Sequence, residues 1–182
     1  MNLGGFVDFV NCFSRGNNQG NLGRRGGCGF ILGDQGGGAW LGWRVLQELV
    51  CLSDCNQLDR FHHRLIAALG IGETANHWMH FANGAGPRDF AELARAVVDS
   101  EHDVPLAAEI LTEGLDWLCR LIEDFPRSLP LSLVGGLSTL YAPRLVALGY
   151  QVVDPEGDAL DGLRFIDQHL NHLIVDHWTS DA

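Results

Sequence analysis

The sequence predicts an α/β protein with an unusually large helical share, and two features carry that prediction. Between residues 39 and 122, apolar residues recur at helical spacing in consecutive segments. Nearer the C-terminus, an apolar run (129–134), a pair of glycines, a helical segment (137–148) and a second short run (150–153) form a strand–helix–strand unit. Units of this kind build α/β sheets and bind ligands at the ends of their strands.

Helical spacing predicts each helix in turn, and glycine or proline marks most of the ends. The predicted helices cover residues 39–50, 58–69, 73–81, 87–98, 105–122, 137–148 and 158–170. Gly70 and Asn83-Gly84 end two of them, because these residues favour helix C-termini. Pro87 and Pro105 suit the first turn of a helix, and Pro126 closes the helix that begins at Pro105.

The N-terminal region has no clear period. Residues 6–10 could form a short strand, but residues 16–21 are rich in turn-forming types, so we interpret residues 1–22 as a leader. Residues 29–32 predict a short buried strand that ends at Gly33. We therefore expect one lobe over residues 23–170 and a tail over 171–182.

Composition excludes several functions. The formal charge is −11, so nucleic acid is not an expected partner. The sequence contains no lysine, which rules out a Walker-type phosphate loop and Schiff-base chemistry in this chain. No apolar run could span a bilayer, so no membrane partner is expected. The five cysteines are irregularly spaced, which favours free thiols and a cytoplasmic protein.

The most informative segment runs from Gly26 to Gly42 and surrounds one carboxylate, Asp34, with glycines. Glycine permits positive φ and close approach of a ligand to the backbone, and a carboxylate held in such a turn can accept hydrogen bonds from hydroxyl groups. The segment therefore predicts a site for a small polar ligand. Asp34 could equally cap the following helix. Trp40 and Trp43 are expected in the core, although both lie close enough in sequence to wall a pocket.

Gly135-Gly136 is the second candidate site, because it follows an apolar run and precedes a helix. Bare backbone and the free N–H groups of a helix N-terminus could receive a nucleotide there. Tight strand-to-helix turns also use glycine for steric reasons alone. Ser138 and Thr139 could donate to a phosphate or could cap the helix.

Histidine and cysteine pairs do not predict a metal site. His77 and His80, His169 and His172, and Cys51 and Cys55 could each share a helix face; none has further ligands at a spacing that completes a tetrahedral site. We predict no structural metal.

The two glycine motifs, in this order, resemble the C-terminal half of the N-acetylglucosamine kinase family, of the BadF/BadG-type ATPases in the actin-like sugar kinase superfamily. The family's first motif corresponds to Gly26-Gly27-Cys28-Gly29 and Gly33-Asp34-Gln35-Gly36-Gly37, followed by Trp40. Its adenosine motif corresponds to Val134-Gly135-Gly136-Leu137-Ser138, and its closing helix to residues 154–162. The resemblance implies the C-terminal lobe of an actin-like (ribonuclease H-like) ATPase fold.

The resemblance also implies roles for the matching residues. Gly27, Cys28 and Gly29 would line an amino-sugar site, and Asp34 would bind sugar hydroxyls. Gly135, Gly136, Leu137 and Ser138 would hold the adenine and ribose of ATP, with Mg²⁺ as the metal of the reaction. A homodimer is the assembly that the resemblance implies.

The chain departs from the family pattern in three ways. Cys28 replaces tryptophan, and Gln35 replaces glutamate. Before Gly23 the family's two phosphate loops and its catalytic aspartate have no counterpart, and Asp8 does not replace them because no glycine-threonine loop follows it. We therefore assign no catalytic residue in this chain and interpret it as a truncated lobe that lacks the N-terminal lobe.

The resulting hypothesis is ATP-dependent phosphorylation of N-acetylglucosamine or glucosamine to the 6-phosphate. Two alternatives remain open. One is a non-catalytic chain that binds sugar, nucleotide or only a partner. The other is an activator ATPase of an acyl-CoA dehydratase or reductase, which would need cluster-ligating cysteines at a subunit interface.

Overall fold

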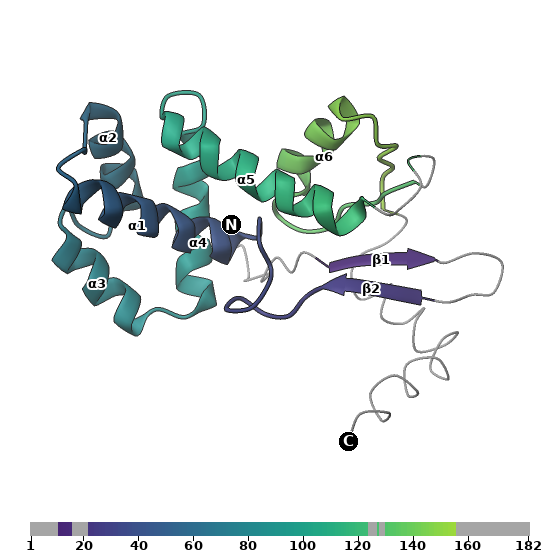
Figure 1. The fold of residues 1–182 in the computed structure, drawn as a ribbon, viewed down its shortest axis with the longest axis horizontal. Coiled ribbons are helices and arrows are strands. Elements are labelled where there is room, and N and C mark those ends of the chain that lie inside the picture. The colour runs from purple at the N-terminus through teal and green to yellow at the C-terminus, as the bar shows by residue number, and fades with distance from the viewer. Residues whose placement is uncertain (1–10, 16–21, 124–126, 128–129, 156–182) are drawn as a thin grey trace, which may run out of the picture. The chain divides into compact units, whose positions relative to one another are not determined.

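A computed structural model describes residues 11–15, 22–123, 127 and 130–155 of the chain. Two strands come first, β1 (Asn11–Arg15) and β2 (Leu22–Gly26), and Figure 1 shows their arrows running in opposite directions. The helices that follow are α1 (Gly38–Asp54), α2 (Arg60–Leu69), α3 (Ala75–Gly84), α4 (Pro87–Asp99), α5 (Pro105–Ile122) and α6 (Ser138–Ala147). Contacts between Cα atoms divide the chain into two compact units. The first contains α1–α5, and the second contains α6 and nearly all of the two strands.

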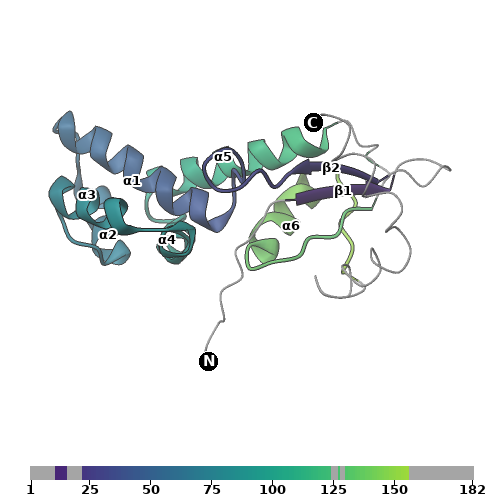
Figure 2. The same ribbon diagram turned by 90° about the horizontal axis from the view of Figure 1, so that it is seen from below.

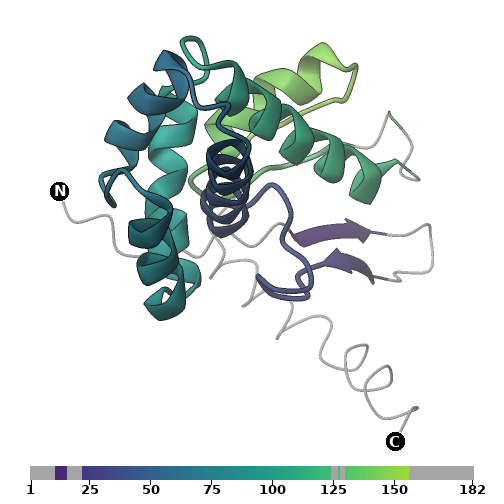
Figure 3. The same cartoon turned by 60° about the vertical axis from the view of Figure 1, so that its left-hand side comes forward.

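The core of the first unit forms around α1, which packs mainly against α4 and also contacts α5 and α3 (Figures 1 and 2). Leu41, Val45 and Leu49, which recur every four residues along one face of α1, are completely buried. Val97 of α4 and Leu111 of α5 are buried to the same extent. Figure 3 views α1 nearly along its axis.

Local chemistry explains where the helices begin and end, and it confirms the helices that the sequence predicts over the described residues. Pro87 and Pro105 are the first residues of α4 and α5. Asp59 caps α2 by accepting hydrogen bonds from the backbone N–H groups of Phe61 (2.9 Å) and His62 (3.0 Å). Gly70 ends α2 with a left-handed φ of 69°, a conformation that glycine adopts without strain.

In the second unit, the strand–helix–strand arrangement is confirmed in a reduced form. Its two runs pair through one parallel bridge, between Leu131 and Val152. The Leu131 N–H donates to the Gln151 carbonyl, and the Val153 N–H donates to the Leu131 carbonyl, both at 2.8 Å. Pro130 has no N–H to donate, which limits extension of the ladder on that side.

Residues 29–32 are a turn, so the predicted buried strand is wrong. The N–H groups of Leu32 (3.2 Å) and Gly33 (2.7 Å) both donate to the Gly29 carbonyl. Positive φ at Gly29 (82°) bends the chain at this point, and Ile31 and Leu32 are consequently 89% and 79% exposed. The apolar run suggested a strand, but the positive φ of Gly29 produces a turn instead.

Several predictions about chain organisation concern residues that the structure does not describe. β1 and β2 were not predicted. The possible strand at 6–10, the helix at 158–170 and the tail at 171–182 lie outside the described residues, and the division at residues 22 and 170 stays a prediction. No helix of the described segments has the combination of length and apolar character needed to cross a bilayer.

Candidate functional site

The loop between β2 and α1 has an unusual backbone. Its φ angles are positive at five positions: Gly26 (76°), Gly27 (69°), Gly29 (82°), Asp34 (57°) and Gly36 (83°). Residues with a Cβ atom avoid this region because Cβ approaches the following carbonyl oxygen, whereas glycine enters it freely. The glycine-rich sequence is therefore required by the path of the chain.

Asp34 occupies the centre of this loop. Its backbone carbonyl accepts a hydrogen bond from Gly37 N–H (2.9 Å), which closes a tight turn directly before α1. Asp34 is 7% exposed and is the one buried charged residue among those whose burial the structure describes. A buried carboxylate needs hydrogen-bond donors around it, so this position suits the recognition of N–H or O–H groups.

Asp34 is not itself the N-cap residue of α1, and its alternative role in capping this helix stays a prediction. The N-cap residue of α1 is Gly37, which has no side chain with which to cap the helix. The left-handed conformation of Asp34 is uncommon for a residue other than glycine, although aspartate and asparagine tolerate it best. The fold thus holds Asp34 in a buried position with a constrained backbone conformation.

Several glycines of the motif have a packing role that sequence reasoning missed. A Cβ on Gly36 would lie 2.7 Å from the Gly114 carbonyl oxygen of α5, and a Cβ on Gly42 would lie 1.9 Å from the Phe90 carbonyl oxygen of α4. A Cβ on Gly38 would touch Ala91 at 3.4 Å. The spacing of Gly38 and Gly42, four residues apart in one helix, was the signal that could have revealed this close helix contact.

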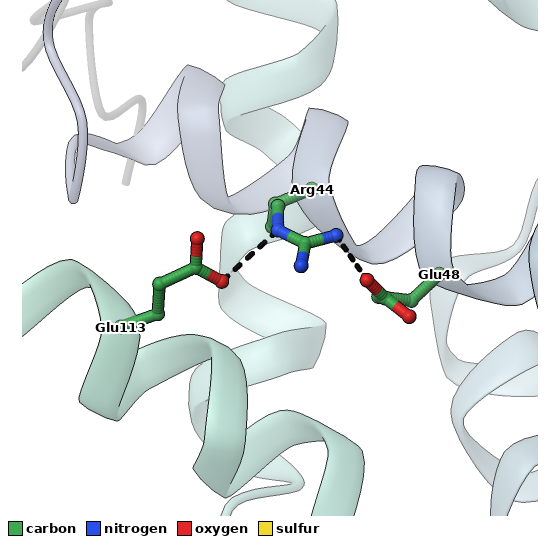
Figure 4. A network of polar contacts seen from close by, with 3 residues as sticks. All are labelled: Arg44, Glu48 and Glu113. Carbon is green, nitrogen blue, oxygen red and sulfur yellow. Dashed lines mark hydrogen bonds and ion pairs between the residues drawn. The ribbon is translucent and has the colours of Figure 1, made fainter.

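Arg44 fixes α1 against α5 close to the loop (Figure 4). Its Nε donates to Glu113 Oε2 of α5 at 3.0 Å, and a terminal guanidinium nitrogen pairs with Glu48 one turn further along α1. Burial alone would lower the pKa of Arg44, but the two carboxylates outweigh it and raise that pKa. Gly36 also packs against Gly114 of α5. Two contacts with α5, at Gly36 and at Arg44, therefore hold the Asp34 turn and α1 in place.

Aromatic residues of the loop, α1 and α4 pack together. The Phe30 ring contacts the rings of Phe90 (centroid distance 5.3 Å) and Trp43 (6.4 Å, edge to face). Trp40 is buried in the core, as expected, whereas Trp43 is 38% exposed. Of the two tryptophans considered as pocket walls, Trp43 alone reaches the surface beside the loop.

The four residues predicted to bind the sugar therefore lie in one loop. Asp34 is buried, Gly27 and Gly29 are half-buried, and the Cys28 thiol is exposed. A Cβ on Gly33 would meet the Cys28 Cβ at 3.1 Å, so Cys28 packs over the residue that precedes Asp34. Their role in binding stays a prediction.

The second motif belongs to the second unit and forms the turn before α6. Gly135 has a φ of 115°, and its carbonyl accepts a hydrogen bond from the Ser138 N–H at 3.1 Å. Leu137 is the N-cap residue of α6, so neither Ser138 nor Thr139 occupies the capping position considered for them. Gly136 is exposed at the N-terminus of this helix. The use of the turn for a nucleotide stays a prediction.

The described residues include no group of three or more histidine, cysteine, aspartate or glutamate side chains that could hold a metal ion. They therefore do not form a cage for the Mg²⁺ that the resemblance implies, and we derive no step through it. His77 instead contacts Thr74, with Nδ1 and Oγ1 3.0 Å apart, and His169 and His172 lie outside the described residues.

Comparison with known proteins bears on the class of this fold. No protein-family model and no curated protein sequence matches the chain. A solved structure does match it, over 80% of this chain, with 27% sequence identity and a TM-score of 0.69. The likeness extends beyond the helix-rich architecture to the sequence, and it supports the kinase family that the glycine motifs indicate.

That structure is of a protein from Chromobacterium violaceum, provisionally assigned as an N-acetylglucosamine kinase. The match covers 52% of the neighbour, so this chain spans about half of the length of the protein that it resembles.

Proposed function

We propose that this chain is the sugar- and adenosine-binding lobe of an ATP-dependent amino-sugar kinase of the BadF/BadG type. Its substrate would be N-acetylglucosamine or glucosamine, phosphorylated on the 6-hydroxyl. The observation that carries the proposal is Asp34, a buried carboxylate in a left-handed conformation within a glycine loop. The likeness to the Chromobacterium violaceum protein supports the same class.

In this proposal the Asp34 carboxylate accepts hydrogen bonds from sugar hydroxyl groups. The backbone at Gly27 and Gly29 admits the ring closely because no Cβ stands in its way. The Cys28 thiol, which is exposed, would contact the sugar where the family has a tryptophan. Specificity would rest on Asp34, because a buried acceptor rejects ligands that cannot donate to it.

The second turn would receive the nucleotide. Gly135 and Gly136 would lie against the adenine and ribose, and the first N–H groups of α6 would face the ligand. ATP supplies the phosphoryl group, and the reaction depends chiefly on positioning and on stabilisation of charge. We assign no general base within this chain; in the proposal, an aspartate outside it deprotonates the sugar hydroxyl.

The test combines calorimetric binding of N-acetylglucosamine, glucosamine and ADP with release of ADP from ATP in the presence of Mg²⁺ and either sugar. Asp34→Asn is the central variant, because asparagine tolerates left-handed φ and keeps the side-chain size while losing the charge. Asp34→Ala removes the acceptor entirely. Circular dichroism of both variants shows whether the fold is kept.

Sugar binding that weakens at least about tenfold in a folded Asp34→Asn variant supports the proposed sugar site. Turnover that depends on sugar would show that this chain is active alone. Sugar and ADP binding without turnover would favour the non-catalytic alternative. Absence of sugar binding by the folded wild-type chain would overturn the proposal.

A further inference from the structure

Two cysteines lie together at the C-terminal end of α1, whereas the Asp34 turn precedes its N-terminal end. Cys51 and Cys55 are both exposed free thiols. Cys55 is the C-cap residue of α1, and its backbone N–H donates to the Cys51 carbonyl at 3.1 Å. This hydrogen bond gives the pair true helical spacing, so both side chains lie on one face of the helix.

The Cys55 thiol affects the pKa of the Cys51 thiol. The neighbouring Cys55, followed by partial loss of hydration and by Glu48, raises the pKa of Cys51. The exposed Cys51 thiol, with its raised pKa, differs from reactive catalytic cysteines, in which nearby positive charge lowers the pKa. The pair therefore differs from a catalytic cysteine, and its spacing and exposure leave both thiols accessible to one ligand.

We propose that Cys51 and Cys55 form a dithiol site that chelates trivalent organoarsenicals. An aryl arsenic(III) centre has two positions open to sulfur, and within the described part of the chain no third metal-binding side chain joins the pair. Soft thiolate ligands suit soft, thiophilic centres, whereas a structural zinc site needs four ligands. The site is independent of the proposed kinase function.

The reaction with phenylarsine oxide balances without an oxidant or reductant. Each thiol forms one arsenic–sulfur bond, the arsenic–oxygen bond breaks, and the two thiol protons leave with the oxide oxygen as one water molecule. Because the second bond forms within the same molecule, the effective concentration of the second thiol is high and a monothiol competes poorly. The adduct closes a ring across the last turn of α1.

The test incubates the full chain with phenylarsine oxide, adds excess glutathione, and measures retained arsenical by native mass spectrometry. We expect the wild type to retain one arsenical, and a dithiol such as dimercaptopropanol to remove it. Cys51→Ser and Cys55→Ser should each lose the arsenical at a glutathione concentration at least about tenfold lower. Cys28→Ser is the matched control, because it removes an exposed cysteine elsewhere and should retain the arsenical as the wild type does.

Two results would overturn the proposal. One is release of the arsenical from the wild type at the same glutathione concentration as from the single variants. The other is retention by both single variants, which would place the arsenical on different cysteines. Both substitutions are at exposed positions, and circular dichroism confirms that the variants compared are folded.

Discussion

Gly36 and Gly114 form a direct contact between backbones, in which a Cβ on Gly36 would lie 2.7 Å from the Gly114 carbonyl oxygen. Gly36 belongs to the turn that Asp34 begins, and Gly114 is buried within α5. The position of the Asp34 turn thus depends on α5, a helix that is distant from it in the sequence.

The first prediction is that Gly36→Ala destabilises the first unit by about 2–4 kcal/mol. A positive φ costs alanine about 1–2 kcal/mol, and the clash with α5 adds a comparable amount. Urea unfolding followed by tryptophan fluorescence measures the loss. Gly29→Ala is the matched control, because Gly29 has nearly the same φ (82° against 83°) and no atom within 4 Å of a built Cβ. Equal losses in the two variants would show that the contact with Gly114 contributes nothing.

The second prediction concerns the crossing of α1 and α4. Gly42→Ala should cost at least about 2 kcal/mol, because a Cβ there would lie 1.9 Å from the Phe90 carbonyl oxygen and the helices would have to separate. Gly84→Ala, at the open C-terminal end of α3, should be neutral or stabilising by up to about 1 kcal/mol. Thermal melts of both variants check this, and a Gly42→Ala variant as stable as wild type would contradict the close crossing.

The third prediction is that Arg44→Met lowers the free energy of unfolding by about 1 kcal/mol. Arg44 pairs with two carboxylates and is partly shielded from water. Enough solvent still reaches it to limit the stabilisation that each ion pair provides. Glu113→Gln should cost less, because Arg44 keeps Glu48. A double-mutant cycle between Arg44 and Glu113 should give a coupling of about 0.5–1 kcal/mol that shrinks with added salt. A coupling of zero would show that the ion pair between Arg44 and Glu113 does not contribute to the free energy of unfolding.

The fourth prediction is a pH dependence from the cap of α2. The His62 backbone N–H lowers the pKa of Asp59; partial loss of hydration opposes this, and the Phe61 N–H and the His62 ring add to the lowering. Because the folded-state pKa is depressed, the stabilisation is present above the unfolded-state pKa and is lost as pH falls through the folded-state value.

Urea midpoints between about pH 6 and about pH 3 measure this contribution. Asp59→Ala should lower Tm by a few degrees at neutral pH and should lose less on acidification than wild type. Asp59→Asn keeps a capping oxygen without a titrating group, so it should retain most of the stability at neutral pH. The same loss on acidification in Asp59→Asn and wild type would assign the effect to other carboxylates.

Local signals in the sequence were sufficient for most helices. Apolar spacing together with Pro87, Pro105 and Gly70 predicted the positions of α2, α4 and α5 to within a few residues. Caps, proline and glycine act within a single turn, so their effect does not depend on the rest of the fold. The strands were harder, because their pairing partners are distant in sequence and short apolar runs do not distinguish a strand from a turn.

The sequence by itself determined that a carboxylate would sit among glycines before a helix, and glycine favours left-handed backbone whatever surrounds it. Tertiary structure alone decided that Asp34 would be buried and that Gly36 and Gly42 would serve contacts with α5 and α4. It also left Trp43, which the sequence predicts in the core, 38% exposed. The physical reason is that backbone conformation is a local property, whereas burial and close approach depend on which distant helices pack together.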